Sequence, residues 1–226
     1  MKNTKINILL LLVAFIPYFI FAQKTVKLKN ETDSISYAFA VSLATQIKKD
    51  GVDNINLKVF NKAFKHALNE KPLTIDANQA DKILEKNKIK KSNMTAQKNL
   101  EEGKTFLEEN GKKEGIVTLE SGLQYAIIQQ GMGGVPTLES QVKTHYRGTL
   151  IDGKVFDSSY DRGKPITFPV TGVIKGWTEA LLLMKEGAKW TLFIPADLAY
   201  GTRGAGGVIP PNATLIFDIE LISIEK

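Results

Sequence analysis

The stretch that decides the fold runs from residue 198 to residue 221 and reads LAYGTRGAGGVIPPNATLIFDIEL. Its last part places an apolar residue at every second position, namely Leu215, Phe217, Ile219 and Leu221. A period of two is typical of a β-strand with one buried face. In front of this strand, Tyr200 opens a glycine-rich loop, 201–207, that leads into Val208, Ile209 and two prolines. The stretch therefore predicts a shaped loop followed by a core strand.

The same alternation extends toward the middle of the chain. Apolar residues alternate over 123–127, and a strand containing Val142 and Tyr146 leads to a hairpin signal at Asp152-Gly153. One helical segment, 177–184, interrupts the strands. The pattern predicts an α+β fold in which an antiparallel sheet wraps around one short helix.

The residues before about 110 have a helical pattern instead. A first helix is expected to begin at Thr32 or Asp33, because both are good N-cap residues and apolar side chains recur every fourth position after them. Gly51 ends this helix, and a second one is expected after Asn54 or Asn56. The two helices predict an all-α N-terminal region.

A third helix is expected from about Thr74 to Asn110. Its early part has a narrow apolar seam of Ala80, Ile83 and Leu84, and the remainder is rich in lysine and glutamate. Burial in a globular core cannot stabilise a helix with so thin an apolar stripe, so we expect it to bridge solvent between two domains. We interpret its lysines as a solvated face rather than a patch for nucleic acid or membrane.

The first 22 residues have the pattern of a secretory signal peptide. Lys2 and Lys5 precede a nearly unbroken apolar run, 8–21, and Ala22 offers a small residue for cleavage before Gln23. The alternative is an uncleaved anchor, but the run is shorter than the roughly 20 apolar residues that span a bilayer, and it contains a proline. Cleavage would lower the formal charge from +6 to +4, which is too weak to indicate nucleic-acid binding.

Composition excludes several kinds of site. The 226 residues include no cysteine, which excludes disulfides, thiol catalysis, cysteine-ligated metal and a lipid-modified cysteine. The two histidines, His66 and His145, cannot form a metal site by themselves. The sequence also offers no phosphate loop, nucleophile elbow or obvious acid–base pair. We therefore expect no metal and no other cofactor.

What the C-terminal half does offer is aromatic residues placed between turns. They are Tyr146, Phe156, Phe168, Trp177, Tyr200 and Phe217. Core packing is the ordinary explanation for scattered aromatic residues. Two placements favour a binding site as well: Phe156-Asp157 closely follows the hairpin signal, and Tyr200 opens the glycine-rich loop.

Five blocks of sequence together resemble the family of FKBP-type peptidyl-prolyl cis/trans isomerases. In family order they are HYRG (145–148), DGKVFDSS (152–159), VIKGW (173–177), LAYG (198–201) and IPPNATLIF (209–217). Blocks in this order are far more specific than one short motif. The helical region and the segment KKEGIVT (112–118) are similar to the exported Mip/FkpA-like subclass, whose members have an N-terminal helical dimerisation domain.

The resemblance implies a division of the chain and a function. The expected parts are a signal peptide at 1–22, a helical dimerisation region at 23–73, a long connecting helix at 74–114 and an isomerase domain at 115–226, folded as an FKBP-like half-barrel. The implied activity is faster rotation about X-Pro bonds in exported proteins, with chaperone-like assistance to folding. The implied partners are proline-containing unfolded or partly folded polypeptides, a second copy of the chain and a macrolide ligand, without nucleic acid. The implied location is the periplasm of a Gram-negative bacterium.

The resemblance also implies the site. Residues expected to act on the bond itself are Tyr146, Phe156, Asp157, Trp177, Tyr200 and Phe217. Residues expected to hold the substrate around it are Arg162, Ile166, Phe168, Val173, Ile174, Val208 and Ile209. In this arrangement Trp177 is the floor of an apolar pocket, and Tyr146, Phe156 and Phe217 are its walls.

Hydrogen bonds are implied at the edge of the same pocket. The Tyr200 hydroxyl and the Ile209 backbone N–H are expected to donate to substrate carbonyls. Asp157 is expected to be an acceptor, held by Tyr146 or Arg162.

Two features depart from the family pattern. Ile166 stands where small cytosolic members have an aromatic residue, and the loop after Phe168 is shorter. Ala205 and Gly206 make the late loop small. We expect these differences to alter sequence preference and macrolide affinity while leaving isomerisation intact.

Two other functions compete with the leading one. The first is a peptide-binding or chaperone module on an FKBP fold without useful turnover, and the retained pocket aromatics argue against it. The second is a small β-rich ligand-binding protein unrelated to proline, which does not account for the ordered blocks.

Overall fold

The computed structural model of the chain describes residues 25–52 and 54–225. The expected signal peptide, 1–22, lies outside the described residues. The chain divides into two units, Met1–Asn54 and Ile55–Lys226. Within the described part, no helix has both the length and the apolar content needed to cross a membrane.

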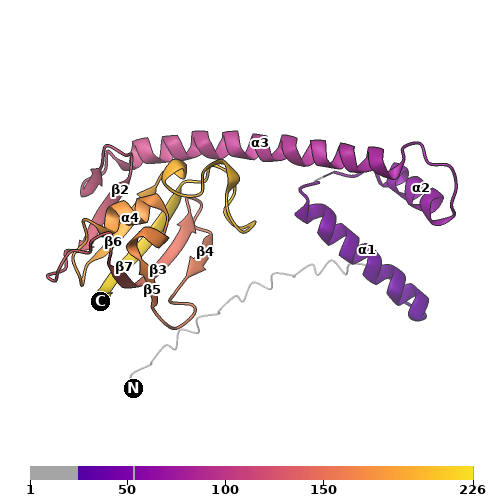
Figure 1. Cartoon of the computed structure of the whole chain (residues 1–226). Coiled ribbons are helices and arrows are strands. Elements are labelled where there is room, and N and C mark those ends of the chain that lie inside the picture. The colour runs from indigo at the N-terminus through magenta and orange to yellow at the C-terminus, as the bar shows by residue number, and fades with distance from the viewer. Residues whose placement is uncertain (1–24, 53, 226) are drawn as a thin grey trace, which may run out of the picture. The chain divides into compact units, whose positions relative to one another are not determined.

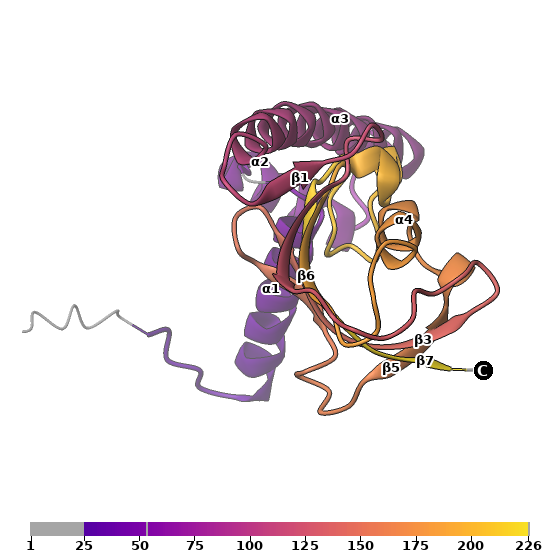
Figure 2. The same cartoon turned by 90° about the vertical axis from the view of Figure 1, so that its left-hand side faces the viewer.

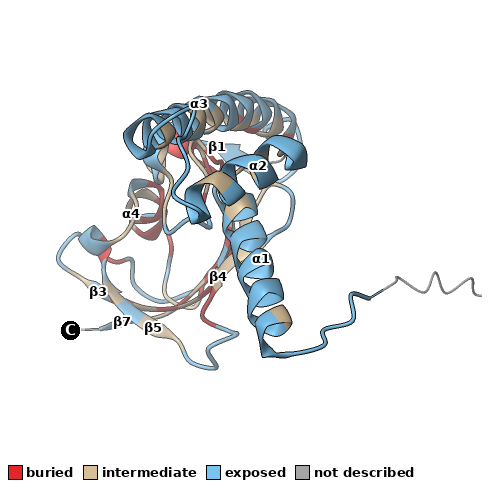
Figure 3. Ribbon diagram, turned by 90° about the vertical axis from the view of Figure 1, so that its right-hand side faces the viewer, coloured by how far each residue is buried: buried red, intermediate tan, exposed pale blue. Residues whose placement is uncertain are grey.

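The first unit contains one described helix, α1 (Glu31–Lys49), and its start differs from the prediction. Its N-cap is Asn30, whose side-chain oxygen accepts a hydrogen bond from the Asp33 N–H at 2.8 Å. Asp33 lies in the first turn instead, where a negative charge favours the helix dipole. None of the residues of α1, all of which are described, is buried, and Figure 3 shows the helix mostly in the colour of exposed residues. Phe39 is the most exposed large apolar side chain on it, at 72%.

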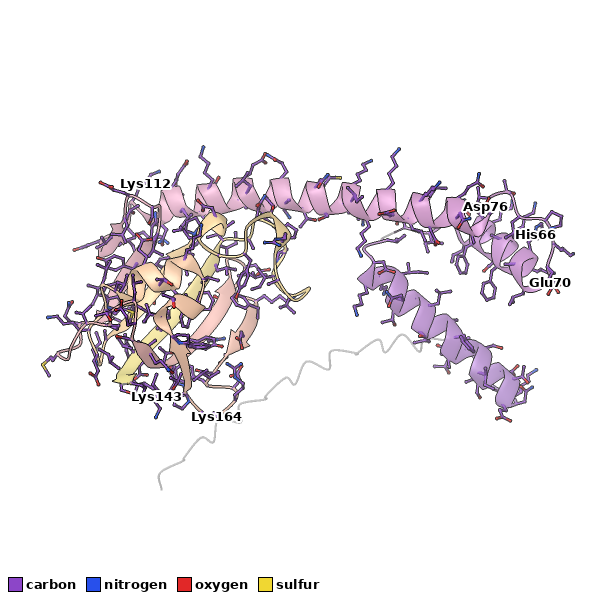
Figure 4. The ribbon with its side chains drawn as sticks, in the orientation of Figure 1. His66, Glu70, Asp76, Lys112, Lys143 and Lys164 are labelled. Carbon is purple, nitrogen blue, oxygen red and sulfur yellow. The ribbon has the colours of Figure 1, made fainter. Side chains whose placement is uncertain are left out.

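The second unit begins with two helices, α2 (Leu57–Leu68) and α3 (Ala77–Asn110), which are visible in Figure 1. Asn56 caps α2, as expected, by accepting hydrogen bonds from two backbone N–H groups of the first turn. The N-cap of α3 is Asp76, labelled in Figure 4, which is two residues later than expected. Asp76 and Gln79 form a capping box with reciprocal bonds of 2.8 and 3.0 Å, and this pair fixes where the helix begins.

The C-terminal turns of α3 correct the expectation that this helix bridges solvent and is not stabilised by burial. Gly103 and Asn110 are buried, and the Asn110 side chain donates to the Gln124 side chain at 3.0 Å. The Gln124 amide in turn donates to the Leu107 carbonyl at 2.8 Å. The helix therefore docks on the strands through a small residue and paired polar groups, which a search for an apolar stripe cannot detect.

The strands form one antiparallel sheet, as predicted. They are β1 (Ile116–Thr118), β2 (Gln124–Gln129), β3 (Gln141–Leu150), β4 (Val155–Ser158), β5 (Ile166–Pro169), β6 (Lys189–Ile194) and β7 (Leu215–Glu225). Their order is β1-β2-β6-β7-β3-β4, and β5 pairs with β3 outside that order. Figure 2 shows how strongly the sheet twists and curves around α4.

The core lies between this sheet and α4 (Lys175–Leu181). The prediction placed this helix at 177–184, so it begins and ends earlier than expected. Trp177, Ala180 and Leu181 of α4 are buried, and so is the alternating face of β7, as predicted from Leu215, Phe217, Ile219 and Leu221. Three short 3-10 helices complete the described elements: η1 (Val170–Gly172), η2 (Ala196–Leu198) and η3 (Gly201–Arg203).

Candidate active site

An open cavity of about 500 Å³ is lined by residues of β3, β4, β5, η1, β7, α4 and the loop that follows η2. Its lining is mainly aromatic and aliphatic, with a few small residues. The lining residues are Tyr146, Phe156, Asp157, Phe168, Gly172, Val173, Ile174, Trp177, Tyr200, Ala205, Gly206, Val208, Ile209 and Phe217. Segments more than 50 residues apart in the sequence therefore build one apolar hollow.

Trp177 holds the aromatic residues of this cavity together. Its ring lies 5.1 Å from Tyr146, 5.2 Å from Phe217 and 6.0 Å from Phe168, measured between ring centroids, and each pair is close to perpendicular. Edge-to-face contacts of this kind are the favoured geometry for aromatic pairs. Because Trp177 is only 4% exposed and has contacts on several sides, it gives the cavity a rigid base.

Gly148 of β3 allows two aromatic walls to meet. Phe156 and Phe217 stand edge to face at 5.4 Å between centroids. A Cβ added at Gly148 would lie 2.6 Å from Phe156 Cζ and 2.7 Å from Phe217 Cε1. Only glycine leaves room for both rings at this position, so Gly148 allows Phe156 and Phe217 to pack against the strand.

The polar edge of the cavity is a three-residue network. The Tyr146 hydroxyl donates to Asp157 Oδ2 at 2.6 Å and accepts from Arg162 Nη2 at 2.8 Å. Arg162 also pairs with Asp157 Oδ1, and its guanidinium carbon lies 5.5 Å from the centroid of the Tyr146 ring. No group of three or more His, Asp or Glu side chains that could hold a metal ion forms anywhere in the described residues.

The network fixes the protonation of both acidic groups. Burial raises the pKa of Tyr146, and its hydrogen bond to Asp157 raises it further. Desolvation also raises the pKa of Asp157, but hydrogen bonds from Tyr146 and Arg162 outweigh that effect and hold the pKa below its ordinary value. At neutral pH the site therefore holds a carboxylate and a protonated tyrosine.

Donors for a substrate carbonyl come from elsewhere in the lining. Burial raises the pKa of Tyr200, and the negative charge of Asp157 raises it further. The Tyr200 hydroxyl has no hydrogen-bond partner among the described residues, and Tyr200 lines the cavity. The Ile209 N–H was expected to bind substrate, but it donates to the Ala205 carbonyl at 3.0 Å and is not free. The Ile174 N–H, by contrast, has no partner within the described part of the chain, and Ile174 lines the cavity.

The structure brings together all six residues expected to act on the bond. Of those expected to hold the substrate, Arg162 and Ile166 do not line the cavity. Arg162 reaches the site through Asp157 and Tyr146, whereas Ile166 pairs with Thr144 between β5 and β3 and packs against the core.

Sequence reasoning did not assign three of the lining residues. They are Gly172, Ala205 and Gly206. All three are small, so the pattern of aromatic residues could not reveal them. The signal available was their position beside lining residues that were predicted, Val173 and Val208.

Comparison with known proteins agrees with this geometry. Residues 133–222 match the family described as FKBP-type peptidyl-prolyl cis-trans isomerase, and residues 32–127 match the domain described as amino terminal to it. The chain is 43% identical to the outer membrane protein MIP of Legionella longbeachae, and the match covers 91% of each chain. It is also 43% identical to a probable FKBP-type peptidyl-prolyl cis-trans isomerase, FkpA, of Neisseria meningitidis, with 84% of this chain and 73% of the other covered.

Solved structures give the same result. The crystal structure of FkpA from Escherichia coli superposes with a TM-score of 0.72 at 34% identity, covering 88% of this chain and 99% of that one. The similarity thus includes the helical region as well as the sheet. The chain belongs to the FKBP-type peptidyl-prolyl cis-trans isomerases, with an N-terminal helical region followed by the isomerase domain.

Proposed function

We propose that the aromatic cavity binds the proline of an X-Pro bond and lowers the barrier to its rotation by excluding water. The observation that supports this most directly is that Trp177, Phe217 and Tyr200 line one common hollow. Rotation breaks amide resonance behind a barrier of roughly 18–20 kcal/mol, which makes the uncatalysed step slow. No bond is cleaved, so the reaction needs neither a nucleophile nor a metal.

Desolvation favours the twisted amide over the planar one. In the twisted state resonance is lost and the carbonyl oxygen carries less charge, so it loses less when water is removed. An apolar cavity therefore destabilises the planar ground state relative to the transition state. A rate gain of about a hundred-thousandfold requires only about 7 kcal/mol of such discrimination.

Each lining group has a proposed part in this discrimination. Trp177 is the floor against which the proline ring packs, and Tyr146, Phe156 and Phe217 are the walls. The Tyr200 hydroxyl donates to a substrate carbonyl, and the Ile174 N–H, free within the described residues, is a second donor. Asp157 keeps Tyr146 and Arg162 in place and presents a fixed negative charge at the rim.

A protease-coupled assay on a short proline peptide tests these roles. Tyr200→Phe removes only the hydroxyl, and Asp157→Leu removes the acceptor of the network, so both are expected to lower kcat/KM while the chain stays folded. The matched control is Tyr160→Phe, because the Tyr160 hydroxyl bonds Glu220 at 3.3 Å and Tyr160 is not a lining residue. Unchanged rates in both site variants would show that the roles are assigned wrongly.

We also propose that residues 23–73 form a homodimer and assist folding clients. Support comes from α1, where Ile35 and Phe39 lie one turn apart on the same helical face and are at least half exposed. Apolar surface of this kind usually marks an interaction site. Two cavities in one dimer would raise the effective concentration of a site around a single client.

Light scattering on the full chain tests the dimer. Phe39→Glu is expected to halve the measured mass, whereas Lys48→Glu, on the same helix, is expected to leave it unchanged. An aggregation assay with a denatured client then tests the folding role separately. Suppression that is equal for the wild type and for Phe39→Glu would rule out a need for the dimer.

Finally, we propose that residues 1–22 are removed on export and that the remaining chain works in the periplasm. The pattern of charged start, apolar run and small residue supports this. The Legionella relative, which is named an outer membrane protein, also supports export. Mass spectrometry of the cell envelope fraction is expected to find a chain that begins at Gln23, and an intact Met1 terminus would overturn the proposal.

A further inference from the structure

The loop between η2 and β7 carries a large share of the cavity lining. Its lining residues are Tyr200, Ala205, Gly206, Val208 and Ile209. Reciprocal backbone bonds between Ala205 and Ile209, of 2.9 and 3.0 Å, close its tip. A bond of 2.9 Å from the Asn212 N–H to the Gly201 carbonyl closes its base. These internal hydrogen bonds stabilise the shape of the loop. The shape of the cavity then depends on the position of the loop as a whole.

Two asparagine side chains tie the end of this loop to α3. Asn99 Nδ2 donates to the Pro211 carbonyl at 2.7 Å, and Asn212 Nδ2 donates to the Ala96 carbonyl at 3.2 Å. These two reciprocal bonds, which we call the amide clasp, join segments more than 110 residues apart. Figure 1 shows the segment between β6 and β7 lying along α3.

The backbone at Asn212 is shaped for the clasp. Its φ is 55°, in the left-handed region that residues other than glycine seldom adopt and that asparagine tolerates best. In this conformation the Asn212 N–H closes the loop base while its side chain reaches α3. One residue thus serves both the loop and the helix.

The helix presents a matching surface. Ala96, Asn99 and Gly103 recur at intervals of three and four and so lie on one helical face. A Cβ added at Gly103 would lie 2.2 Å from Thr214 Oγ1, so glycine permits a very close approach of α3 to the start of β7. That approach brings Ala96 and Asn99 within hydrogen-bonding reach of Pro211 and Asn212.

We propose that Asn99 and Asn212 are positioning residues for the isomerase reaction. The clasp holds the loop so that Tyr200, Val208 and Ile209 close on the proline above Trp177. Helix α3 is then part of the catalytic framework in addition to connecting the helical region to the sheet. The proposal rests on the assignment of the cavity as the proline site.

Variants of the full chain can remove the clasp without deleting an element. Asn99→Asp keeps the shape of the side chain but has no N–H donor, and its carboxylate faces the Pro211 carbonyl. Asn212→Gly keeps the left-handed backbone and deletes only the side chain. Asn93→Asp is the matched control, because Asn93 is an exposed residue of the same helix and the charge change is the same. Asn99→Gln retains a donor and is expected to restore part of the loss.

The measurements are kcat/KM, the melting temperature and amide hydrogen exchange. A lost hydrogen bond changes the equilibrium constant between the held and the released loop by a factor of about 2 to 12, so each clasp variant is expected to lower kcat/KM by up to that factor. Exchange at the backbone N–H of residue 212 is expected to rise by up to the same factor, while exchange in β6 stays unchanged. The double variant is expected to lose little more than either single one, since both hold the same loop.

Different results would contradict the clasp proposal and the assignment of the cavity as the proline site. If Tyr200→Phe lowers kcat/KM but neither clasp variant does, the clasp proposal fails and the site assignment stands. If exchange rises in β6 as much as at Asn212, the asparagines stabilise the whole domain and do not position the loop. If Tyr200→Phe and Asp157→Leu both leave the rate unchanged, the site assignment fails, and the clasp proposal fails with it.

Discussion

Gly148→Ala adds one methyl group to β3, where Gly148 lies against two of the aromatic walls of the cavity. The new Cβ would lie 2.6 and 2.7 Å from two atoms of the Phe156 ring and 2.7 Å from Phe217 Cε1. Carbon atoms cannot approach so closely, so both rings must move. Gly148 is paired with Asp157 on one side and Phe217 on the other, and this pairing holds the backbone in place. The rings can yield only by turning toward the cavity of about 500 Å³.

The expected losses of stability and activity follow from the movement of the two rings toward the cavity. Overpacking of a well-packed core costs about 1–3 kcal/mol of unfolding free energy, and we expect the low end because the cavity can accept the rings. For a chain of this size about 1 kcal/mol corresponds to roughly 2–4 °C in melting temperature. Rings that intrude on the proline site should cost more in activity, about ten- to a hundredfold in kcat/KM, which is about 1.4–2.8 kcal/mol.

The protease-coupled proline assay and thermal unfolding measure the two effects on the same sample. Gly134→Ala is the control, since its added Cβ would lie 3.6 Å from Ile224 Cδ1, an ordinary contact. A variant that melts several degrees lower but keeps full kcat/KM would refute the reasoning, because displaced walls would then not matter to the site. An unchanged melting temperature together with an unchanged kcat/KM would show that the added methyl group does not clash with the two rings.

Three further predictions concern the polar edge and the docking of α3. Arg162→Ala is expected to raise the pKa of Asp157, since the desolvation of the carboxylate stays while one hydrogen bond and one positive charge are lost. NMR titration of the Asp157 carboxyl measures the shift, and an unchanged pKa would contradict the prediction. Because the folded pKa of Asp157 is depressed, its contribution to stability is fully present above its ordinary pKa of about 3.9 and is lost as pH falls through the lower folded value. Asp157→Asn should therefore make the free energy of unfolding fall less steeply at acid pH, and an unchanged slope would count against the network. Gly103→Ala is expected to lower the melting temperature despite the better helix propensity of alanine. Adding Thr214→Ala removes the clashing Oγ1 and should recover part of the lost melting temperature. A single variant that melts higher than the wild type would mean that α3 docks less tightly on Thr214.

The aromatic part of the site was predicted from the resemblance of five ordered sequence blocks to the family, and each of those blocks is local in the sequence. Trp177 follows a glycine at the start of a short helix, and Phe217 falls on the buried face of an alternating strand. Such positions depend on turns and periodicity within about ten residues. The structure places both residues in one cavity with Tyr146, Phe156 and Tyr200.

Hydrogen-bond donors were harder to predict. The Ile209 N–H is engaged by Ala205 because the loop closes on itself, and nothing in the residue types of 205–209 indicates which N–H groups remain free. Helix starts were also missed by two to three residues, since Asn30 and Asp76 compete with neighbouring residues that cap almost as well.

The sequence by itself determined the antiparallel sheet and the short helix beneath it, because hydrophobic periodicity and turn chemistry act over short distances along the chain. The apolar residues that line the cavity were implied by the five ordered blocks that resemble the family. Only the tertiary structure decided how Tyr146, Asp157 and Arg162 share their protons and how Asn99 reaches Pro211. In the sequence Asn99 is one more polar residue in a polar helix. Its role depends on where α3 lies against β7, and that position results from the close approach at Gly103 and from hydrogen bonds between segments that are far apart in the chain.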